Sequence, residues 1–121
     1  MTSHVLTDIY WKLVQLNGTP AIVGDAHEAH IILQSNDPRI VGSSGCNRMF
    51  GSYELDGDHL TLRPGGMTMM YCSESLMEQE RAFVAALSAT TSYVIDGETL
   101  ELRDGDRSLA QFESRGASPA S

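Results

Sequence analysis

The sequence predicts one α+β domain, in which a curved antiparallel sheet or barrel-like meander of about eight short strands is closed by one helix at about residues 75–88. Three observations lead to this fold class. The chain has 121 residues, the length of one ordinary domain. Short stretches rich in β-branched and aromatic residues alternate with Gly, Asp, Asn and Pro turn signals. A single segment has the spacing of an amphipathic helix. We therefore expect a loose lead-in at residues 1–6, the folded domain at 7–113 and a disordered tail at 114–121.

The strands before the helix are marked by alternation and by the turns that separate them. Ile9, Trp11 and Leu13 share one side at the period of two that is typical of a half-buried strand. Asn17-Gly18 is a turn signal, and Asp56-Gly57-Asp58 is a hairpin signal. The strands predicted in this half are residues 9–16, 30–34, 39–41, 52–55, 59–63 and 67–72, with a turn at 17–20, a loop at 23–29, a turn at 35–38 and a chain break at 64–66.

The helix is predicted from a cap and an apolar stripe. Ser75 followed three residues later by Glu78 has the pattern of a capping box, in which each side chain satisfies a free backbone N–H. The stripe that should face the sheet consists of Leu76, Phe83, Val84 and Leu87. Three strands are predicted after the helix, at residues 92–95, 99–103 and 108–113, joined by Asp-Gly hairpin turns.

Charge and hydropathy exclude two classes of partner. The net charge is −8 and the pI about 4.7, and no Lys/Arg cluster offsets this charge, so we expect no nucleic-acid binding. No apolar run reaches the 18 or so residues of a membrane-spanning helix. The N-terminus lacks the basic and apolar regions of a signal peptide. We expect a periplasmic or other envelope location if a leader has been removed ahead of Met1, and a cytoplasmic one otherwise.

The stretch around which the chain is organised is GSSGCNRMFGSY, residues 42–53. Its glycines indicate bulges, positive φ angles or close backbone approach, because neither a phosphate-loop pattern nor a following helix is present. Cys46 and Cys72 lie 26 positions apart. In an oxidising compartment their disulfide would stabilise the fold by roughly 3–4 kcal/mol, whereas in a reducing cytosol we expect two buried thiols. No histidine is close in sequence to activate either cysteine as a nucleophile.

A candidate polar cluster centres on Glu80. Helical spacing places Glu80 on the same face as the apolar stripe, where an unpaired carboxylate costs several kcal/mol. Arg48 and the hydroxyl of Thr68 are its candidate partners, and Asn47 completes the cluster. One interpretation is an internal tie between the helix and the glycine-rich loop. The other is a general acid or base, although no second carboxylate accompanies it.

No metal, cofactor or catalytic site is predicted. Met67 and Met69 alternate with Met70, so these thioethers do not converge on one copper site, and core filling is the better interpretation. His27 and His30 are spaced like a zinc pair but have no second ligand pair. Hairpin chemistry already explains the two Asp-Gly-Asp turns.

With these residues in view, the chain resembles the META domain family, typified by the bacterial heat-inducible HslJ proteins. The resemblance runs from about Thr7 to Glu113 and depends on the combination of G-C-N-x-x-x-G, T-x-M-x-C and E-x-x-F-x-x-x-L. The residues that carry it are Trp11-Lys12-Leu13, Asn17-Gly18, Gly45 to Gly51, Thr68 to Cys72, Glu80, Phe83, Leu87 and Leu100-Glu101-Leu102. It implies a small α+β fold found in envelope or lipoprotein contexts, links to stress response and antibiotic tolerance, and no established catalytic activity or cofactor.

The function that we expect is therefore that of a non-enzymatic, stress-associated envelope protein. It would be a monomer that binds an unknown protein or envelope component and does not span a membrane. One alternative is a small carrier of an apolar ligand such as a lipid, since a curved sheet closed by one helix can leave an apolar cleft. The other is a redox-sensing dithiol protein that uses Cys46 and Cys72.

Overall fold

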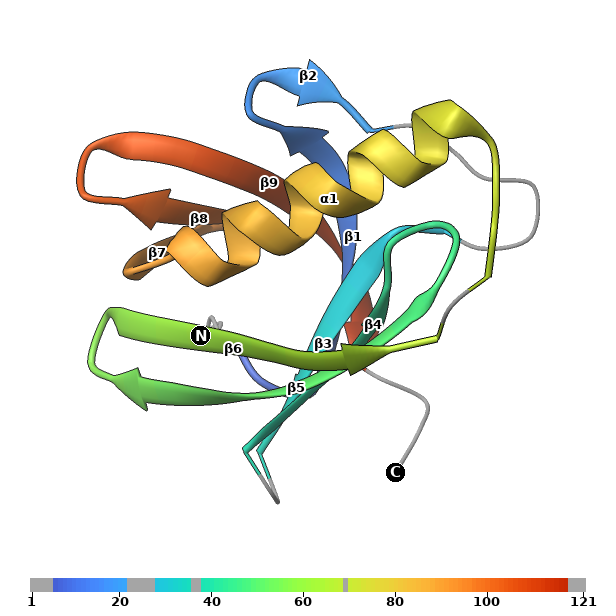
Figure 1. The fold of residues 1–121 in the computed structure, drawn as a ribbon. Coiled ribbons are helices and arrows are strands. Elements are labelled where there is room, and N and C mark those ends of the chain that lie inside the picture. Colours follow the sequence, from blue (N-terminus) through green and yellow to red (C-terminus); the bar gives the residue numbers. More distant parts are fainter. Residues whose placement is uncertain (1–5, 22–27, 36–37, 69, 118–121) are drawn as a thin grey trace.

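The strands follow one another in a meander whose two ends meet (Figure 1). This computed structural model describes residues 6–21, 28–35, 38–68 and 70–117, and within them it has nine strands and one α-helix. The strand order is β2-β1-β3-β4-β5-β6-β7-β8-β9, every pairing is antiparallel, and β9 also pairs with β1. The sheet therefore curls until its hydrogen bonds form a ring, which confirms the predicted α+β class and its single domain.

The elements lie close to the positions that the sequence indicates. They are β1 (Ile9–Leu16), β2 (Thr19–Pro20), β3 (His30–Gln34), β4 (Arg39–Ser43), β5 (Arg48–Asp56), β6 (His59–Met67), α1 (Glu74–Ala89), β7 (Ser92–Asp96), β8 (Thr99–Asp104) and β9 (Arg107–Ala117). Most of the loop predicted at 23–29 and the middle of the turn predicted at 35–38 lie outside the described residues.

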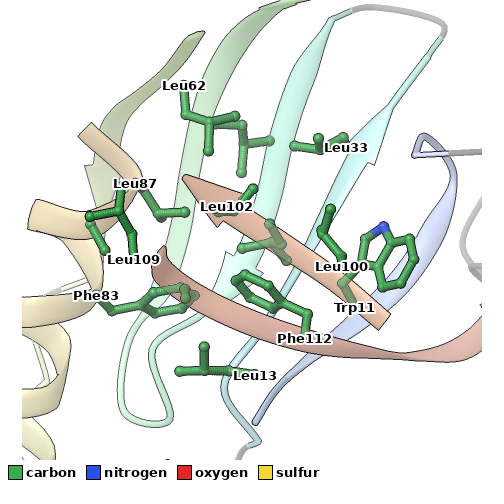
Figure 2. Close-up of a cluster of buried hydrophobic side chains, with 14 of the residues drawn as sticks. Trp11, Leu13, Leu33, Leu62, Phe83, Leu87, Leu100, Leu102, Leu109 and Phe112 are labelled. Atoms are coloured by element: carbon green, nitrogen blue, oxygen red, sulfur yellow. The ribbon is translucent and has the colours of Figure 1, made fainter. Parts of the chain in front are cut away.

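The core fills the inside of the ring, and α1 closes it (Figure 2). Along most of the longer strands alternate residues point inward, so the strands supply most of the buried side chains. Phe83 of α1 meets Phe112 of β9 with ring centroids 6.0 Å apart, and both rings are fully buried. The other labelled members of this core are Trp11, Leu13, Leu33, Leu62, Leu87, Leu100, Leu102 and Leu109.

The first turn is tighter than predicted. Asn17 and Gly18 both have positive φ, at 53° and 81°, as a two-residue hairpin turn requires. Thr19–Pro20 does not extend the turn: it forms β2 and pairs back onto the end of β1. Proline is compatible with this position because β2 is an edge strand, which has no neighbour on its other side.

The glycine-rich segment and the stretch before the helix depart most from prediction. β5 begins at Arg48 rather than at residue 52, and the predicted break at 64–66 lies inside β6. Gly65 is the extra residue of a bulge there, since Phe50 pairs with Gly66 and Gly51 pairs with Pro64. The strand predicted at 67–72 is wrong: β6 ends at Met67, and the described residues from there to Ser73 are irregular.

The helix exists where predicted but begins differently. Its N-cap is Ser73, whose Oγ accepts a hydrogen bond from the Leu76 N–H at 3.3 Å. The capping box predicted at Ser75 and Glu78 is therefore wrong, because Ser75 already lies in the first helical turn. Phe83 is buried as expected.

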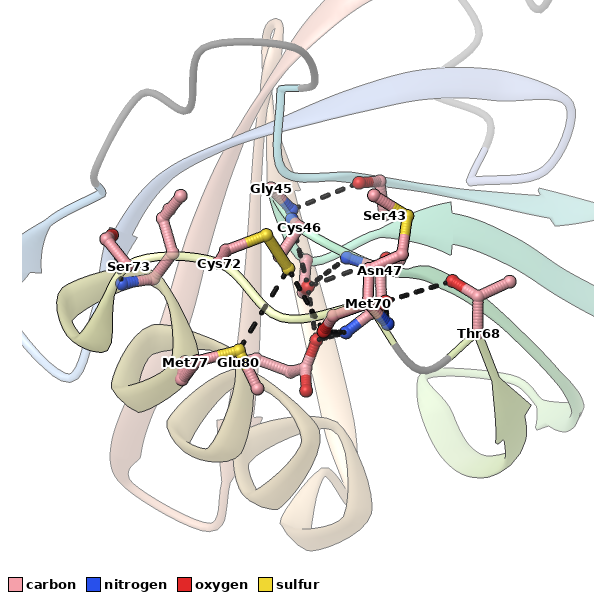
Figure 3. Close-up of a disulfide and its surroundings, with 12 residues drawn as sticks. Ser43, Gly45, Cys46, Asn47, Thr68, Met70, Cys72, Ser73, Met77 and Glu80 are labelled. Atoms are coloured by element: carbon pink, nitrogen blue, oxygen red, sulfur yellow. Dashed lines mark hydrogen bonds between the residues drawn. A yellow bond between two sulfur atoms is a disulfide. The ribbon is translucent and has the colours of Figure 1, made fainter.

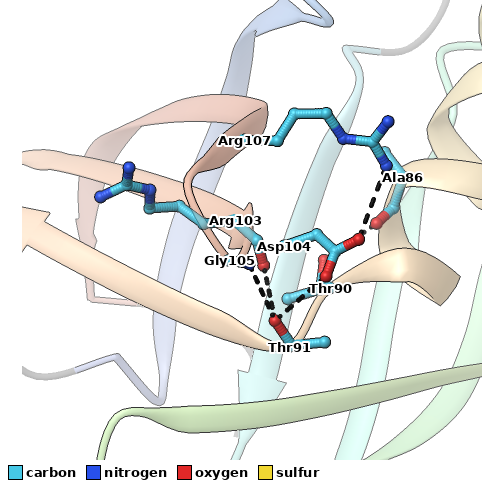
Figure 4. Close-up of polar contacts among 7 residues, drawn as sticks. All are labelled: Ala86, Thr90, Thr91, Arg103, Asp104, Gly105 and Arg107. Carbon is cyan, nitrogen blue, oxygen red and sulfur yellow. Dashed lines mark hydrogen bonds and ion pairs between the residues drawn. The ribbon is translucent and has the colours of Figure 1, made fainter.

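The C-terminal end of α1 is tied to the β8–β9 turn (Figure 4). The Thr90 hydroxyl donates to the Ala86 carbonyl at 2.9 Å, which satisfies one of the last helical carbonyls. The Thr91 Oγ1 accepts the Gly105 N–H at 3.3 Å and lies 3.4 Å from the Arg103 carbonyl. These bonds fix the direction in which the chain leaves the helix and enters β7.

Both ends of the domain extend beyond the predicted limits. β9 continues through residues 114–117, which were expected to be a disordered tail, and it pairs Ala117 with Ile9 of β1. At the other end Leu6 is buried, and its carbonyl accepts a hydrogen bond from the Trp11 indole at 2.9 Å. Residue 6 is therefore part of the core rather than of a loose lead-in. Residues 1–5 and 118–121 lie outside the described part of the chain.

Candidate functional site

The tight turn between β4 and β5 is buried and bonded to itself. Ser44 and Asn47 pair across it, because the Ser44 N–H donates to the Asn47 carbonyl at 3.0 Å and the Asn47 N–H donates to the Ser44 Oγ at 3.1 Å. The Cys46 N–H also reaches the Ser44 Oγ, at 3.3 Å. Gly45 has a φ of 97°, a conformation that glycine adopts without strain. The turn thus holds its shape while its side chains point toward the helix.

A disulfide joins this turn to the chain that leads into α1 (Figure 3). Cys46 and Cys72 are bonded, with their Cα atoms 6.1 Å apart, so of the two states left open by the sequence the structure has the disulfide. Cys72 directly precedes the N-cap Ser73, and the bond therefore fixes where the helix begins. The Cys46 Sγ also lies 4.0 Å from the Met77 Sδ. This is a van der Waals contact, because a disulfide sulfur carries no hydrogen to donate.

The side chain of Asn47 binds on both of its polar atoms. Its Nδ2 donates to the Glu80 Oε1 at 2.8 Å and to the Met70 carbonyl at 3.2 Å. Its Oδ1 accepts from the Met70 N–H at 2.6 Å and from the Thr68 hydroxyl at 3.1 Å. An asparagine amide has two donors and two acceptor sites, so all of its hydrogen-bonding capacity is used. Asn47 therefore holds the backbone of Met70 on both sides while it also binds the helix.

Glu80 lies in the cluster, but its partners differ from those predicted. It is 8% exposed, and its Oε1 accepts hydrogen bonds from the Ser44 hydroxyl at 2.9 Å and from Asn47. The predicted pairing with Arg48 and Thr68 is wrong. The Arg48 side chain is exposed, and the backbone N–H of Arg48 donates to the Thr68 Oγ1 at 3.0 Å. Arg48 is the exposed first residue of β5, whereas Asn47 is the last residue of the buried turn and bonds Glu80.

Ser44 is the member of the cluster that the sequence analysis missed. The Ser44–Glu80 bond is the nearest approach of this site to a nucleophile and a base. However, Ser44 is fully buried, and its Oγ also accepts the N–H groups of Cys46 and Asn47. The arrangement is suited to joining the turn, the segment before the helix and α1. We call the set of Ser44, Cys46, Asn47, Cys72 and Glu80 the clamp.

A family model described as META domain matches residues 4–116, which is nearly the whole chain. The chain belongs to the META domain family. The clamp residues Cys46, Asn47, Cys72 and Glu80 are among those on which the resemblance in sequence depends. No curated protein matches the chain.

Solved structures share the fold of this META domain. A protein from Burkholderia xenovorans determined by NMR has 26% sequence identity and a TM-score of 0.70, with 90% of this chain and 83% of that chain covered. A DUF4847-family protein from Bacteroides vulgatus, a crystal structure, has 19% identity and a TM-score of 0.65, with 90% and 94% covered. A further NMR structure has 23% identity and a TM-score of 0.66, with 89% and 91% covered.

Of the histidine and methionine candidates of the META domain, His30, Met67 and Met70 lie in the described part of the chain. Among the described residues no group of three or more His, Cys, Asp or Glu side chains is placed to hold a metal ion. His30 stacks on Tyr10 with centroids 4.2 Å apart, and its Nδ1–H donates to the Glu28 carbonyl at 2.8 Å. His27 and Met69 lie outside the described residues. Met70 is 53% exposed.

Elsewhere the described part of the META domain has grooves at its surface. Three cavities lined by described residues have volumes of about 240, 330 and 760 Å³, and all are open to solvent. The largest lies beside Tyr53 and His59, away from the clamp, and burial raises the pKa of Tyr53. Near the smallest, burial and the hydrogen bond to Glu28 raise the pKa of Tyr10 to about 12. No helix that the structure describes is long and apolar enough to cross a bilayer.

Proposed function

We propose that this META domain is a non-enzymatic, stress-associated protein of the cell envelope that acts by binding a protein or another envelope component. The Cys46–Cys72 disulfide carries the proposal. Disulfides persist in oxidising compartments such as the bacterial periplasm and are rare in the cytosol. Because this one fixes the start of α1 and lies within the clamp, it is part of the fold rather than an addition at the surface.

The bonding of the clamp supports a binding role rather than catalysis. Glu80, the carboxylate that the sequence offered as an acid or base, is shielded from solvent and engaged by two neutral donors. A reacting group must touch its substrate, and the most buried hydroxyl of the site, that of Ser44, has no exposed surface. The association with stress rests on the resemblance to the heat-inducible HslJ proteins.

The test is to locate the natural gene product and determine its redox state in its own host. Cells are fractionated, free thiols are blocked, and the protein is examined with and without reduction for a mass-adding thiol label. We expect an envelope protein that takes up the label at both cysteines only after reduction. Cys46→Ser with Cys72→Ser is the matched control, and it should take up none. A cytoplasmic protein whose two cysteines carry the blocking group, and which therefore takes up no label even after reduction, would contradict the location.

The functional arm compares a deletion strain with strains that carry the gene again. Loss of heat or antibiotic tolerance on deletion, with recovery on return of the wild-type gene, is the expected result. A turnover that is abolished by Glu80→Gln in a protein that still folds would show that the domain is an enzyme instead.

No observation favours the two alternatives. A carrier needs an internal chamber, whereas the inside of the ring is filled by side chains such as Leu100, Phe112 and Phe83, all fully buried. A redox sensor needs an accessible sulfur, and here Cys46 is 2% exposed whereas Cys72 is partly exposed.

A further inference from the structure

Two large apolar side chains are exposed beside the clamp. Met70 is 53% exposed and Tyr71 is 90% exposed, more than any other large apolar residue that the structure describes. Most tyrosines bury the greater part of their ring, because the ring carries a large apolar area. Met70 and Tyr71 lie between β6 and α1, in the stretch whose apolar composition led to the prediction of a strand.

The backbone that carries these side chains is fixed at both ends. The N–H and carbonyl of Met70 are both held by the Asn47 amide, at 2.6 and 3.2 Å. Cys72 is held by the disulfide, and Ser73 caps the helix. Tyr71 is therefore the single residue between two anchored neighbours. A surface held in place before binding loses less conformational entropy on association, and the tyrosine ring itself has few torsions to lose.

The charges around Tyr71 restrict the kind of partner. Glu74 and Glu78 are exposed in the first turns of α1, one helical turn apart on the same face, and the whole chain carries −8. Arg48, whose backbone N–H is bonded to the Thr68 hydroxyl, is an exposed basic residue at the start of β5. The overall negative charge disfavours an anionic lipid surface and, by mutual repulsion, a second copy of the chain. It favours a protein that offers basic side chains.

We propose that Met70 and Tyr71 form the docking anchor of this domain, and that Tyr71 enters an apolar pocket on a protein partner whose rim carries Lys or Arg. The clamp then has a second role, since it presents the anchor in one conformation. This inference rests on the proposed binding function and adds the residues that bind and the chemistry of the partner.

The first step of the test is crosslinking in the natural host. A photoreactive phenylalanine replaces Tyr71 in one strain and Val94 in another. Val94 is the control because it is also exposed, at 44%, but lies beyond the other end of α1. The 16 residues of this helix span about 24 Å. We expect one discrete protein adduct from position 71 and none from position 94. An adduct with lipid, an adduct with a second copy of the chain, or the same adducts from both positions would overturn the docking anchor. An adduct from position 94 alone would leave the binding function standing and remove this site.

The second step is affinity measured with the purified adduct protein. Tyr71→Ala should weaken binding about 30-fold, as expected for an aromatic anchor, whereas Val94→Ala should leave it within twofold. Replacement of Glu74 and Glu78 by Lys should slow association and reduce its dependence on salt. Because Tyr71 is almost wholly exposed, Tyr71→Ala should unfold at the same temperature as the wild type. Binding by Tyr71→Ala within twofold of the wild type would refute the assignment.

Discussion

Replacing Asn47 by alanine should destabilise this domain more than any exposed substitution, because its amide joins three segments at once. Asn47→Ala removes two donated and two accepted hydrogen bonds. The bond to the buried Glu80 carboxylate is charge-assisted and contributes about 1.5–3 kcal/mol. Each bond to the half-exposed Met70 backbone contributes about 0.5–1 kcal/mol, since water can replace it in part. The bond from the hydroxyl of Thr68 contributes little free energy, because Thr68 is exposed and water can replace this bond.

These contributions add to a loss of roughly 2.5–5 kcal/mol, which is a large part of the 5–15 kcal/mol that holds a typical domain. For a chain of this length the unfolding temperature should fall by about 10–20 °C. The assay is urea and thermal unfolding, followed by circular dichroism on protein with the disulfide intact.

Two further variants make this prediction specific. Arg48→Ala, in the next residue, should change the free energy of unfolding by no more than about 0.5 kcal/mol, because that side chain is exposed. Asn47→Asp keeps the size of the side chain but places a second carboxylate against Glu80, so it should be at least as damaging as alanine at neutral pH. The reasoning fails if Asn47→Ala costs less than about 1 kcal/mol, or if Arg48→Ala costs as much as Asn47→Ala.

Three other predictions concern the disulfide, the close approach of β4 to β3 at Gly42, and the loss of stability at alkaline pH. Reduction of the Cys46–Cys72 bond should lower the free energy of unfolding by about 3.5 kcal/mol, from the 26-residue separation, and an unchanged denaturation midpoint would contradict this. Gly42→Ala should cost more than about 2 kcal/mol, because its Cβ would overlap the His30 carbonyl oxygen of β3. Gly65→Ala, whose Cβ would lie 3.7 Å from the nearest atom, should be tolerated in the same unfolding assay. The pKa of Tyr10 is raised from 10.0 to about 12, so the stability that its neutral phenol contributes is complete below pH 10 and lost as pH rises toward 12. Stability curves of the wild type and Tyr10→Phe should therefore converge over that interval, and parallel curves would refute it.

The sequence predicted the fold well because the signals that define it are local. Alternation along β1 and the Asp-Gly turns at the hairpins both depend on neighbouring residues, and the helix is long enough for its spacing to be unmistakable. The N-cap was predicted two residues late because Ser73 and Ser75 are both acceptable caps. The disulfide at Cys72 decides between them, and that contact is distant in sequence.

The sequence predicted most of the residues of the candidate site but not which of them bond to one another. Cys46, Cys72, Asn47 and Glu80 all lie in the clamp. The choice of Arg48 as the partner of Glu80 followed opposite charge, whereas in the structure Arg48 is exposed at the start of β5 and the neutral Asn47 of the buried turn bonds Glu80. Ser44 was missed because a serine in a glycine-rich turn has no distinctive local signal. The strand predicted at 67–72 failed because Met70 and Tyr71 are exposed rather than packed, although their composition is apolar.

The pairing of β1 with β9 has a consequence for how the domain is made. These strands come from opposite ends of the fold, and they pair from Ile9 with Ala117 to Leu16 with Ala110. The first strand to emerge from the ribosome must therefore wait for the last, and the fully buried Phe112 arrives only with that last strand. Closing contacts so distant in sequence is slow. Until β9 has emerged, the nascent chain has an open sheet, and the ring closes only when this last strand pairs with β1.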